Sequence, residues 1–96
     1  MADFESILRV DTPEVRVTEV RLEPGASTGR HRHNYDCVVV PLTAGTLRLV
    51  AAEGESAVVL SPGAAYYRKA GVEHTVFNAG GAPLAFIDVE LKGRPG

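Results

Sequence analysis

Short apolar runs separated by glycine and proline cover most of the chain. The runs occupy residues 15–22, 37–42, 46–51, 56–61, 64–69, 74–78 and 84–91. Hydrophobic and polar positions alternate clearly in VRVTEVRL (15–22) and TLRLVA (46–51), as is typical of strands with one buried face. Strands of about five to eight residues, with turn residues after each, predict an all-β sandwich or barrel.

No segment has the sustained 3.6-residue apolar period and the caps of a helix. Residues 4–10 (FESILRV) fit either a short helix or a strand, and we expect a strand. We therefore expect an N-terminal strand or arm over residues 1–14, a barrel over 15–91 and a tail over 92–96. Pro41 stands inside an apolar run, and because proline cannot donate a ladder hydrogen bond it predicts an edge, a bulge or a bend.

Size and composition predict one domain with a modest core. The chain has 96 residues, of which 45% are hydrophobic, and a domain of this size buries roughly 60–70% of its unfolded surface. An oligomer interface would add to that burial, so we expect a homodimer. The formal net charge of −2 gives no basic footprint for nucleic acid or for an anionic membrane.

Cysteine content and terminal composition predict a cytoplasmic protein. Cys37 is the single cysteine, so an internal disulfide is excluded. The first ten residues have no basic segment followed by a long apolar run, so we expect no signal peptide. No stretch approaches the roughly 20 apolar residues of a membrane helix.

The three histidines are candidate metal ligands. His31 and His33 are one residue apart, so in a strand their side chains project to the same side. A metal site then needs a third ligand from another strand, and His74, which opens the run HTVFN, can supply it. The alternative is that all three are ordinary surface or core histidines.

Glycine spacing around these histidines adds a second signal. In the first stretch, five residues separate Gly25 from the pair His31-x-His33, and Gly45 follows later. In the second stretch, seven residues separate Gly63 from Gly71, two separate Gly71 from His74, and three separate His74 from Asn78. The arrangement resembles the two half-motifs of the cupin superfamily and covers about residues 15–91. The resemblance implies a small double-stranded β-helix barrel, jelly-roll-like, that binds Fe, Mn, Ni or Zn through His31, His33 and His74. It also implies a homodimer formed through the outer sheet or an exchanged N-terminal strand.

The sequence departs from the family pattern at two positions. Lys69 stands where the second motif has proline, which we expect the fold to tolerate. The first motif lacks its glutamate, and Cys37 stands at that place. Because Gly45 comes one residue later than the motif requires, we expect a bulge near Pro41 to absorb the extra residue.

The missing glutamate leaves the fourth ligand open. If strand alternation persists, Cys37 shares a face with the histidines, and its thiolate would favour zinc. Asp36 is the alternative if the intervening turn changes the alternation. We favour a third reading, in which Cys37 is a small buried residue at the start of an apolar strand.

Thiol dioxygenases, a branch of the cupins, also replace this glutamate. Some of them join a nearby cysteine to a tyrosine that follows the last histidine. Here all three tyrosines precede His74, so that crosslink does not carry over.

Several polar residues are candidates for a substrate pocket. Alternation places Tyr66 and Arg68 on one face of a strand, and an inward Arg68 would bind an anion bidentately. Tyr35 is a further pocket candidate. The alternative is that this face is an outer or oligomer surface. We expect Arg30 and Arg32 to be solvated or paired with Asp36 or Glu73, and Asn78 to be structural.

These observations leave three functional hypotheses. The first is a metal-dependent enzyme, an oxygenase or isomerase acting on a small, anionic molecule. The second is a non-catalytic module that binds a small molecule or a metal, and the third is a barrel without metal. Nucleotide-binding, serine-hydrolase and dithiol motifs are absent, and no general base is evident, which disfavours hydrolysis.

Overall fold

Nine β-strands make up the regular structure of residues 3–93, the part of the chain that this computed structural model describes. They are β1 (Phe4–Asp11), β2 (Val15–Leu22), β3 (Ser27–Arg32), β4 (Asp36–Pro41), β5 (Gly45–Ala51), β6 (Gly54–Leu60), β7 (Tyr66–Arg68), β8 (Glu73–Asn78) and β9 (Leu84–Leu91). No helix in residues 3–93 is long and apolar enough to span a membrane.

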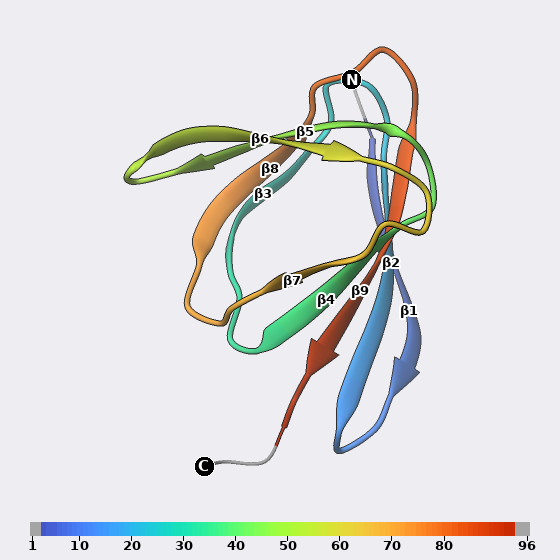
Figure 1. Cartoon of the computed structure of the whole chain (residues 1–96), viewed down its shortest axis with the longest axis vertical. Helices are drawn as coiled ribbons and strands as arrows, with labels where there is room; N and C mark the ends of the chain where they lie inside the picture. Colours follow the sequence, from blue (N-terminus) through green and yellow to red (C-terminus); the bar gives the residue numbers. More distant parts are fainter. Residues whose placement is uncertain (1–2, 94–96) are drawn as a thin grey trace.

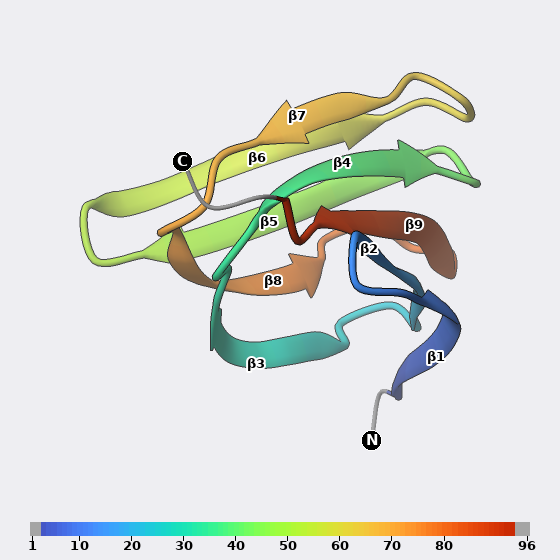
Figure 2. The same cartoon turned by 90° about the horizontal axis from the view of Figure 1, so that it is seen from below.

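The strands form two antiparallel sheets that face each other (Figures 1 and 2). One sheet has the order β1-β2-β9-β4-β7 and the other has the order β3-β8-β5-β6. Figure 1 shows the β1–β2 hairpin and the end of β9 extending beyond the other sheet at the lower side of the molecule. The predicted all-β double-sheet barrel is therefore confirmed.

Most strands lie where the hydrophobic pattern predicts them. Residues 4–11 form a strand, as expected, and it pairs with β2 along most of its length. The short strand β3 contains His31 and ends just before His33, and the hydrophobic pattern did not predict it as a separate element. The division into residues 1–14, 15–91 and 92–96 stays a prediction, and residues 94–96 lie outside the described part.

The expected irregularity near Pro41 is present one residue beyond it, where Leu42 N (2.9 Å) and Thr43 N (3.3 Å) both donate to Ala85 O, as in a β-bulge. Pro41 is buried at the end of β4, and the β4–β9 register is regular from the pair Asp36–Leu91 to the pair Pro41–Phe86. The extra residue therefore lies directly after Pro41, in this irregularity at Leu42 and Thr43. Proline is tolerated here because the pairing of β4 with β7 stops at Val39, so no ladder bond is missing.

One end of the barrel is filled by apolar side chains, and we call it the closed end. It contains Leu22, Leu60 and Leu84, all buried, together with Gly45. A Cβ atom on Gly45 would lie only 2.1 Å from Leu84 Cδ2, so only glycine lets these strands approach so closely. Dense apolar packing at this end is the main stabilising feature of the fold.

Asn78 closes the same end with side-chain hydrogen bonds to the backbone. Its Nδ2 donates to the carbonyl oxygens of Leu22 (2.9 Å) and Ala82 (2.8 Å), and its Oδ1 accepts from Gly80 N (2.9 Å). Every polar atom of this buried side chain is thus satisfied. The prediction that Asn78 is structural is confirmed.

Candidate metal centre

The pairing of β3 with β8 brings the three histidines together. His31 lies directly opposite His74 in the register of these antiparallel strands. His33 extends the pairing past the end of β3, because its N–H donates to Val72 O (2.8 Å) and its carbonyl accepts from Gly71 N (2.7 Å). The three imidazole rings lie edge to face, with centroids 4.8–4.9 Å apart.

The Nε2 atoms of the three rings converge on one point. His33 Nε2 lies 3.2 Å from His31 Nε2 and 3.0 Å from His74 Nε2. Two nitrogens bound at about 2.1 Å to one ion lie about 3.0 Å apart for a right angle and about 3.4 Å apart for a tetrahedral angle. The observed separations therefore fit three donors that share one metal ion.

The backbone around a bulge sets the tautomer of His31. The β3–β8 register shifts between Ser27 and Arg30, and Gly29 has φ of 74°. There the carbonyl oxygen of Gly29 lies 3.1 Å from His31 Nδ1, and the Thr28 hydroxyl lies at the same distance from that nitrogen. Since a carbonyl only accepts, Nδ1 carries the proton and Nε2 keeps its lone pair for a metal.

His33 and His74 are held neutral. Burial is the main cause, with repulsion from neighbouring histidines and from Arg68, and together they lower the pKa of each imidazole to about 4. Metal binding requires neutral imidazole, so at neutral pH both rings are ready to act as ligands. The nature, protonation and spacing of the donors all fit a divalent metal ion.

Arg68 lies beside this centre and faces inward. Its Nη1 lies 3.4 Å from His74 Nε2 and its Nη2 donates to the Tyr66 hydroxyl at 3.3 Å. Within residues 3–93 it forms no ion pair with a carboxylate. A guanidinium without a carboxylate partner, next to a metal centre, is suited to bind an anionic group.

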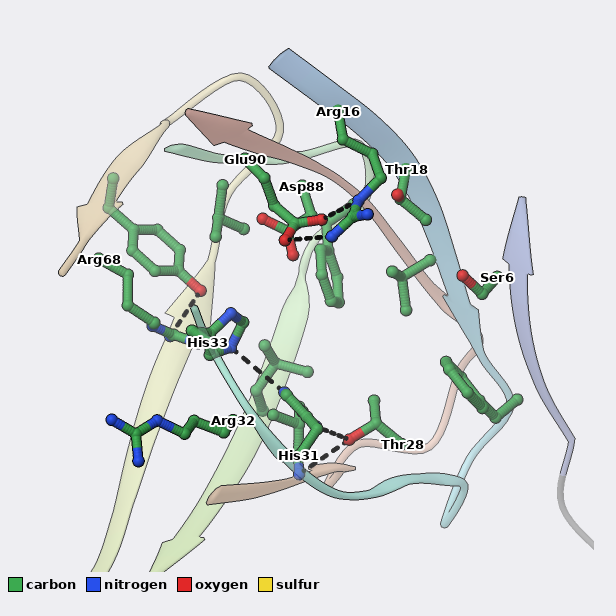
Figure 3. Close-up of a pocket in the computed structure, with 17 residues that line it drawn as sticks. Ser6, Arg16, Thr18, Thr28, His31, Arg32, His33, Arg68, Asp88 and Glu90 are labelled. Carbon is green, nitrogen blue, oxygen red and sulfur yellow. Dashed lines mark hydrogen bonds and ion pairs between the residues drawn. The ribbon is translucent and has the colours of Figure 1, made fainter. Parts of the chain in front are cut away.

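Next to the histidines is a cavity of about 370 Å³ between the two sheets (Figure 3). Its wall is apolar toward the closed end, where Val39, Phe86 and Leu47 contribute, and polar at the other end. We call that polar end, with His31, His33, Arg68, Asp88 and Glu90, the open end. His74 is not among the residues that line this cavity, but its Nε2 lies 3.0 Å from that of His33, which does.

Arg16 and Glu90 form a bidentate ion pair at the open end. Arg16 Nε lies 2.8 Å from Glu90 Oε1, and its Nη2 lies 3.0 Å from Oε2. Figure 3 shows this pair across the cavity from His31. Because each charge is already neutralised by the other, the pair shapes the cavity without leaving a free charge.

Cys37 does not belong to the three-histidine group but neighbours it through His33. Its sulfur, one nitrogen of His33 and one oxygen of Asp88 form a separate group within 4.8 Å. Burial, then the Asp88 carboxylate, raise the pKa of the thiol to about 12. A protonated thiol is a poor ligand, which supports the buried-residue reading, while ligation by Cys37 stays a prediction.

The other two candidates point elsewhere. Asp36 accepts from Ala70 N (2.7 Å) and from the Tyr67 hydroxyl, on the outer side of the sheet. Tyr35 lies beside Arg16, with the guanidinium carbon 6.0 Å from the ring centre, and is not among the residues that line the cavity. Its role as a pocket residue remains untested, whereas Tyr66 lines the cavity as expected. The expected pairing of Arg30 with Glu73 is present at 3.0 Å.

Asp88, Glu90 and Arg16 are site residues that the sequence reasoning missed. Alternation in LAFIDVEL (84–91) puts Asp88 and Glu90 on the same face as Leu84 and Phe86, which are buried. Charged residues on the inward face of an otherwise apolar strand are a signal that could have found them.

Comparison with known proteins gives consistent matches. Residues 18–90 match the sequence profile of the family described as "Cupin domain". The β-alanine degradation protein BauB of Pseudomonas aeruginosa PAO1 is 55% identical over 85 residues, which cover 88% of this chain and 90% of that protein.

Comparison with solved structures agrees with these sequence matches. A cupin domain from Bordetella pertussis Tohama I superposes with a TM-score of 0.91 at 41% identity, over 94% of each chain. The polyketide cyclase RemF of Streptomyces resistomycificus superposes with a TM-score of 0.73 at 24% identity, over 99% of this chain and 70% of that one. At that identity the likeness concerns the fold alone.

Proposed function

The chain belongs to the cupin family, and from that premise we propose that it is a metal-dependent enzyme acting on a small carboxylate. His31, His33 and His74 hold a divalent ion, and Arg68 binds the carboxylate. The observation that carries this function is the convergence of three Nε2 atoms beside an arginine that has no carboxylate partner, at the edge of a cavity.

The candidate ions are Fe, Mn, Ni and Zn, and of these neutral imidazole suits Fe, Ni and Zn best. Three neutral ligands leave the full charge of the ion in place, so an anionic substrate is attracted. When bound, the ion would act as a Lewis acid on a substrate oxygen.

Arg68 is placed to hold the substrate. The guanidinium hydrogen bond to His74 Nε2 uses the lone pair that a metal ion needs, so Arg68 must give up this contact when metal binds. Two cations so close repel each other, and a carboxylate between them removes the repulsion. A relative named for β-alanine degradation supports a short carboxylate as the class of substrate.

Tyr66 and the apolar wall complete the pocket. Burial is the main cause that raises the pKa of Tyr66, so its hydroxyl stays protonated at neutral pH and can donate to a substrate oxygen. Val39 and Phe86 exclude water from the same space, which strengthens each polar contact. Oxygenation and isomerisation are the two reaction classes we expect.

Metal reconstitution tests the centre. The purified protein is stripped with a chelator, then incubated anaerobically with Fe(II), Mn(II), Ni(II) or Zn(II), and desalted before elemental analysis. We expect a stoichiometric amount of at least one metal in the wild type and little in His33→Ala. Failure to retain any of the four metals would leave the metal-free barrel as the correct reading.

Turnover tests catalysis. Oxygen uptake by the Fe(II) form with a panel of short carboxylates detects an oxygenase, and exchange of substrate protons in D2O, followed by NMR, detects an isomerase. A metal-loaded protein that binds these compounds but turns none over would instead be a non-catalytic binding module. The homodimer and the cytoplasmic location stay predictions, and light scattering tests the first.

A further inference from the structure

One carboxylate oxygen in the cavity has no hydrogen-bond partner. Asp88 Oδ1 is a buried side-chain atom for which residues 3–93 provide no donor. The side chain lines the cavity and points into it from β9 (Figure 3). Leaving a buried acceptor unpaired is costly, so the position of this atom requires an explanation.

The neighbours of Asp88 in residues 3–93 leave its Oδ1 unpaired. The nearby Arg16 donates to Glu90 through Nε and Nη2. The side-chain partner of Asp88 is the thiol of Cys37, which is a weak donor. Asp88 forms no ion pair within the described part of the chain.

The same cavity therefore presents a guanidinium and a carboxylate that form no ion pair with each other within residues 3–93. Arg68 lies at the metal centre without a carboxylate partner, and Asp88 lies on β9 without a cationic partner in residues 3–93. Direct contact would have neutralised them, as it does for Arg16 and Glu90.

We propose that Asp88 determines specificity by binding the ammonium group of a ligand whose carboxylate is bound by Arg68, so that the ligand is a short amino carboxylate. This rests on the proposed function, in which Arg68 binds a carboxylate. The ammonium donates to Oδ1 and satisfies it, and the two ends of the ligand neutralise the two charges of the cavity. A carboxylate without the amine leaves Oδ1 unpaired and brings a second negative charge into the cavity.

The wild-type protein allows a test without any variant. Zn(II)-loaded protein is titrated calorimetrically with glycine, β-alanine, 4-aminobutanoate and 5-aminopentanoate, and with the amine-free carboxylate of each chain length. We expect at least one amino carboxylate to bind at least about tenfold more tightly than its amine-free counterpart, as a buried unpaired acceptor predicts. The chain length that binds best reports the span between Arg68 and Asp88.

Two variants and one control locate the effect. Asp88→Asn keeps the shape of the side chain and removes its charge, so it should abolish the preference for the amine while the amine-free carboxylate binds as before or more tightly. Arg68→Met should weaken both ligands of a pair. Glu14→Gln, at an exposed carboxylate in the β1–β2 turn, should change neither. Thermal melting of each variant checks that it is folded.

The outcomes separate this inference from the proposed function. If amine-free carboxylates bind as tightly as the amino carboxylates at every chain length, or if Asp88→Asn weakens both members of a pair equally, Asp88 does not read an ammonium group, and carboxylate binding by Arg68 still stands. If no carboxylate binds to the metal-loaded protein, both the inference and the proposed function are wrong.

Discussion

The two ends of the barrel are built from the same strands but differ in composition and in polar contacts. At the closed end, Leu22, Leu60 and Leu84 are buried, and the polar atoms of Asn78 are all paired. At the open end, three imidazoles share a point and Asp88 Oδ1 has no partner within residues 3–93. The buried side-chain atom that has no hydrogen-bond partner within residues 3–93 therefore lies where a ligand can satisfy it.

This contrast separates stability from chemistry along each strand. In β2 and β9, Leu22 pairs with Leu84 at one end, and Arg16 pairs with Glu90 at the other. Inward positions at one end of a strand therefore serve packing, and those at the other end face the cavity. Substitutions at the two ends should consequently affect different measured quantities.

His74→Ala should have the largest effect, and only at the open end. Removing one of three ligands should lower metal affinity by about a thousandfold, because a structural zinc ion contributes on the order of 10 kcal/mol shared among its ligands. The metal-free fold should keep its stability, since the closed end is unchanged. Calorimetric titration with Zn(II) and urea unfolding of the metal-free protein measure the two quantities.

A His74→Ala protein that is unfolded where the metal-free wild type is folded would contradict this separation, because the open end would then contribute to the stability of the fold. The control is His74→Gln, which preserves a polar side chain of similar size. It should be stable and also bind metal poorly.

Leu22→Ala should produce the opposite pattern. Leu22 is fully buried at the closed end, so its truncation should lower the free energy of unfolding by about 3–4 kcal/mol through lost burial and a cavity. Zinc affinity of the folded protein should stay within a factor of a few. The matched control is Leu8→Ala on β1, where the leucine is 58% exposed and the change should be small.

The pH dependence of the metal-free protein should report the buried imidazoles. His33 and His74 have pKa values of about 4 when folded and about 6.5 when unfolded. Between these values the unfolded chain binds more protons, so stability should fall as pH decreases from about 6.5 to 4, by about 3 kcal/mol for one histidine.

Urea unfolding of the metal-free protein at several pH values measures that dependence. Ion pairs lower the pKa of some carboxylates, such as Glu19 beside Arg21. Their contribution to the stability of the protein is lost at still lower pH and is common to all variants. The difference between wild type and His74→Gln isolates the histidine contribution. Equal slopes in the two proteins between about pH 6.5 and 4 would show that His74 is not held neutral by burial.

Much of the fold was predictable because local signals determine it. Alternation and turn residues locate most strands, and two glycine-histidine spacings identify the three candidate ligands from the sequence alone. The extra residue before Gly45 lies directly after Pro41, where Leu42 N and Thr43 N both donate to Ala85 O. The sequence indicated an irregularity near this proline, but a proline inside an apolar run indicates several irregularities equally well and does not say which residue is unpaired.

The charged part of the cavity was not predicted because it depends on pairing between distant strands. Arg16 and Glu90 are 74 positions apart, and only the position of β9 between β2 and β4 brings them together. For Tyr35 the difficulty is local and does not involve distant strands. The assumed alternation does not hold through residues 33–35, which lie between β3 and β4.

Thr28→Val should have the smallest effect, and it tests whether the open end depends on residues that do not bind metal. The Thr28 hydroxyl contacts His31 Nδ1 (3.1 Å) and donates to Gly29 O (2.9 Å), so it fixes both the ring and the carbonyl that sets its tautomer. Valine keeps the shape without the hydroxyl, and zinc affinity should fall about tenfold, while Thr28→Ser retains the contact and should bind zinc normally. Because Val76 N also donates to this hydroxyl (3.3 Å), unfolding by urea is measured in parallel. A loss of stability without a loss of zinc affinity would mean that Thr28 supports the β3–β8 pairing and does not orient the ligand.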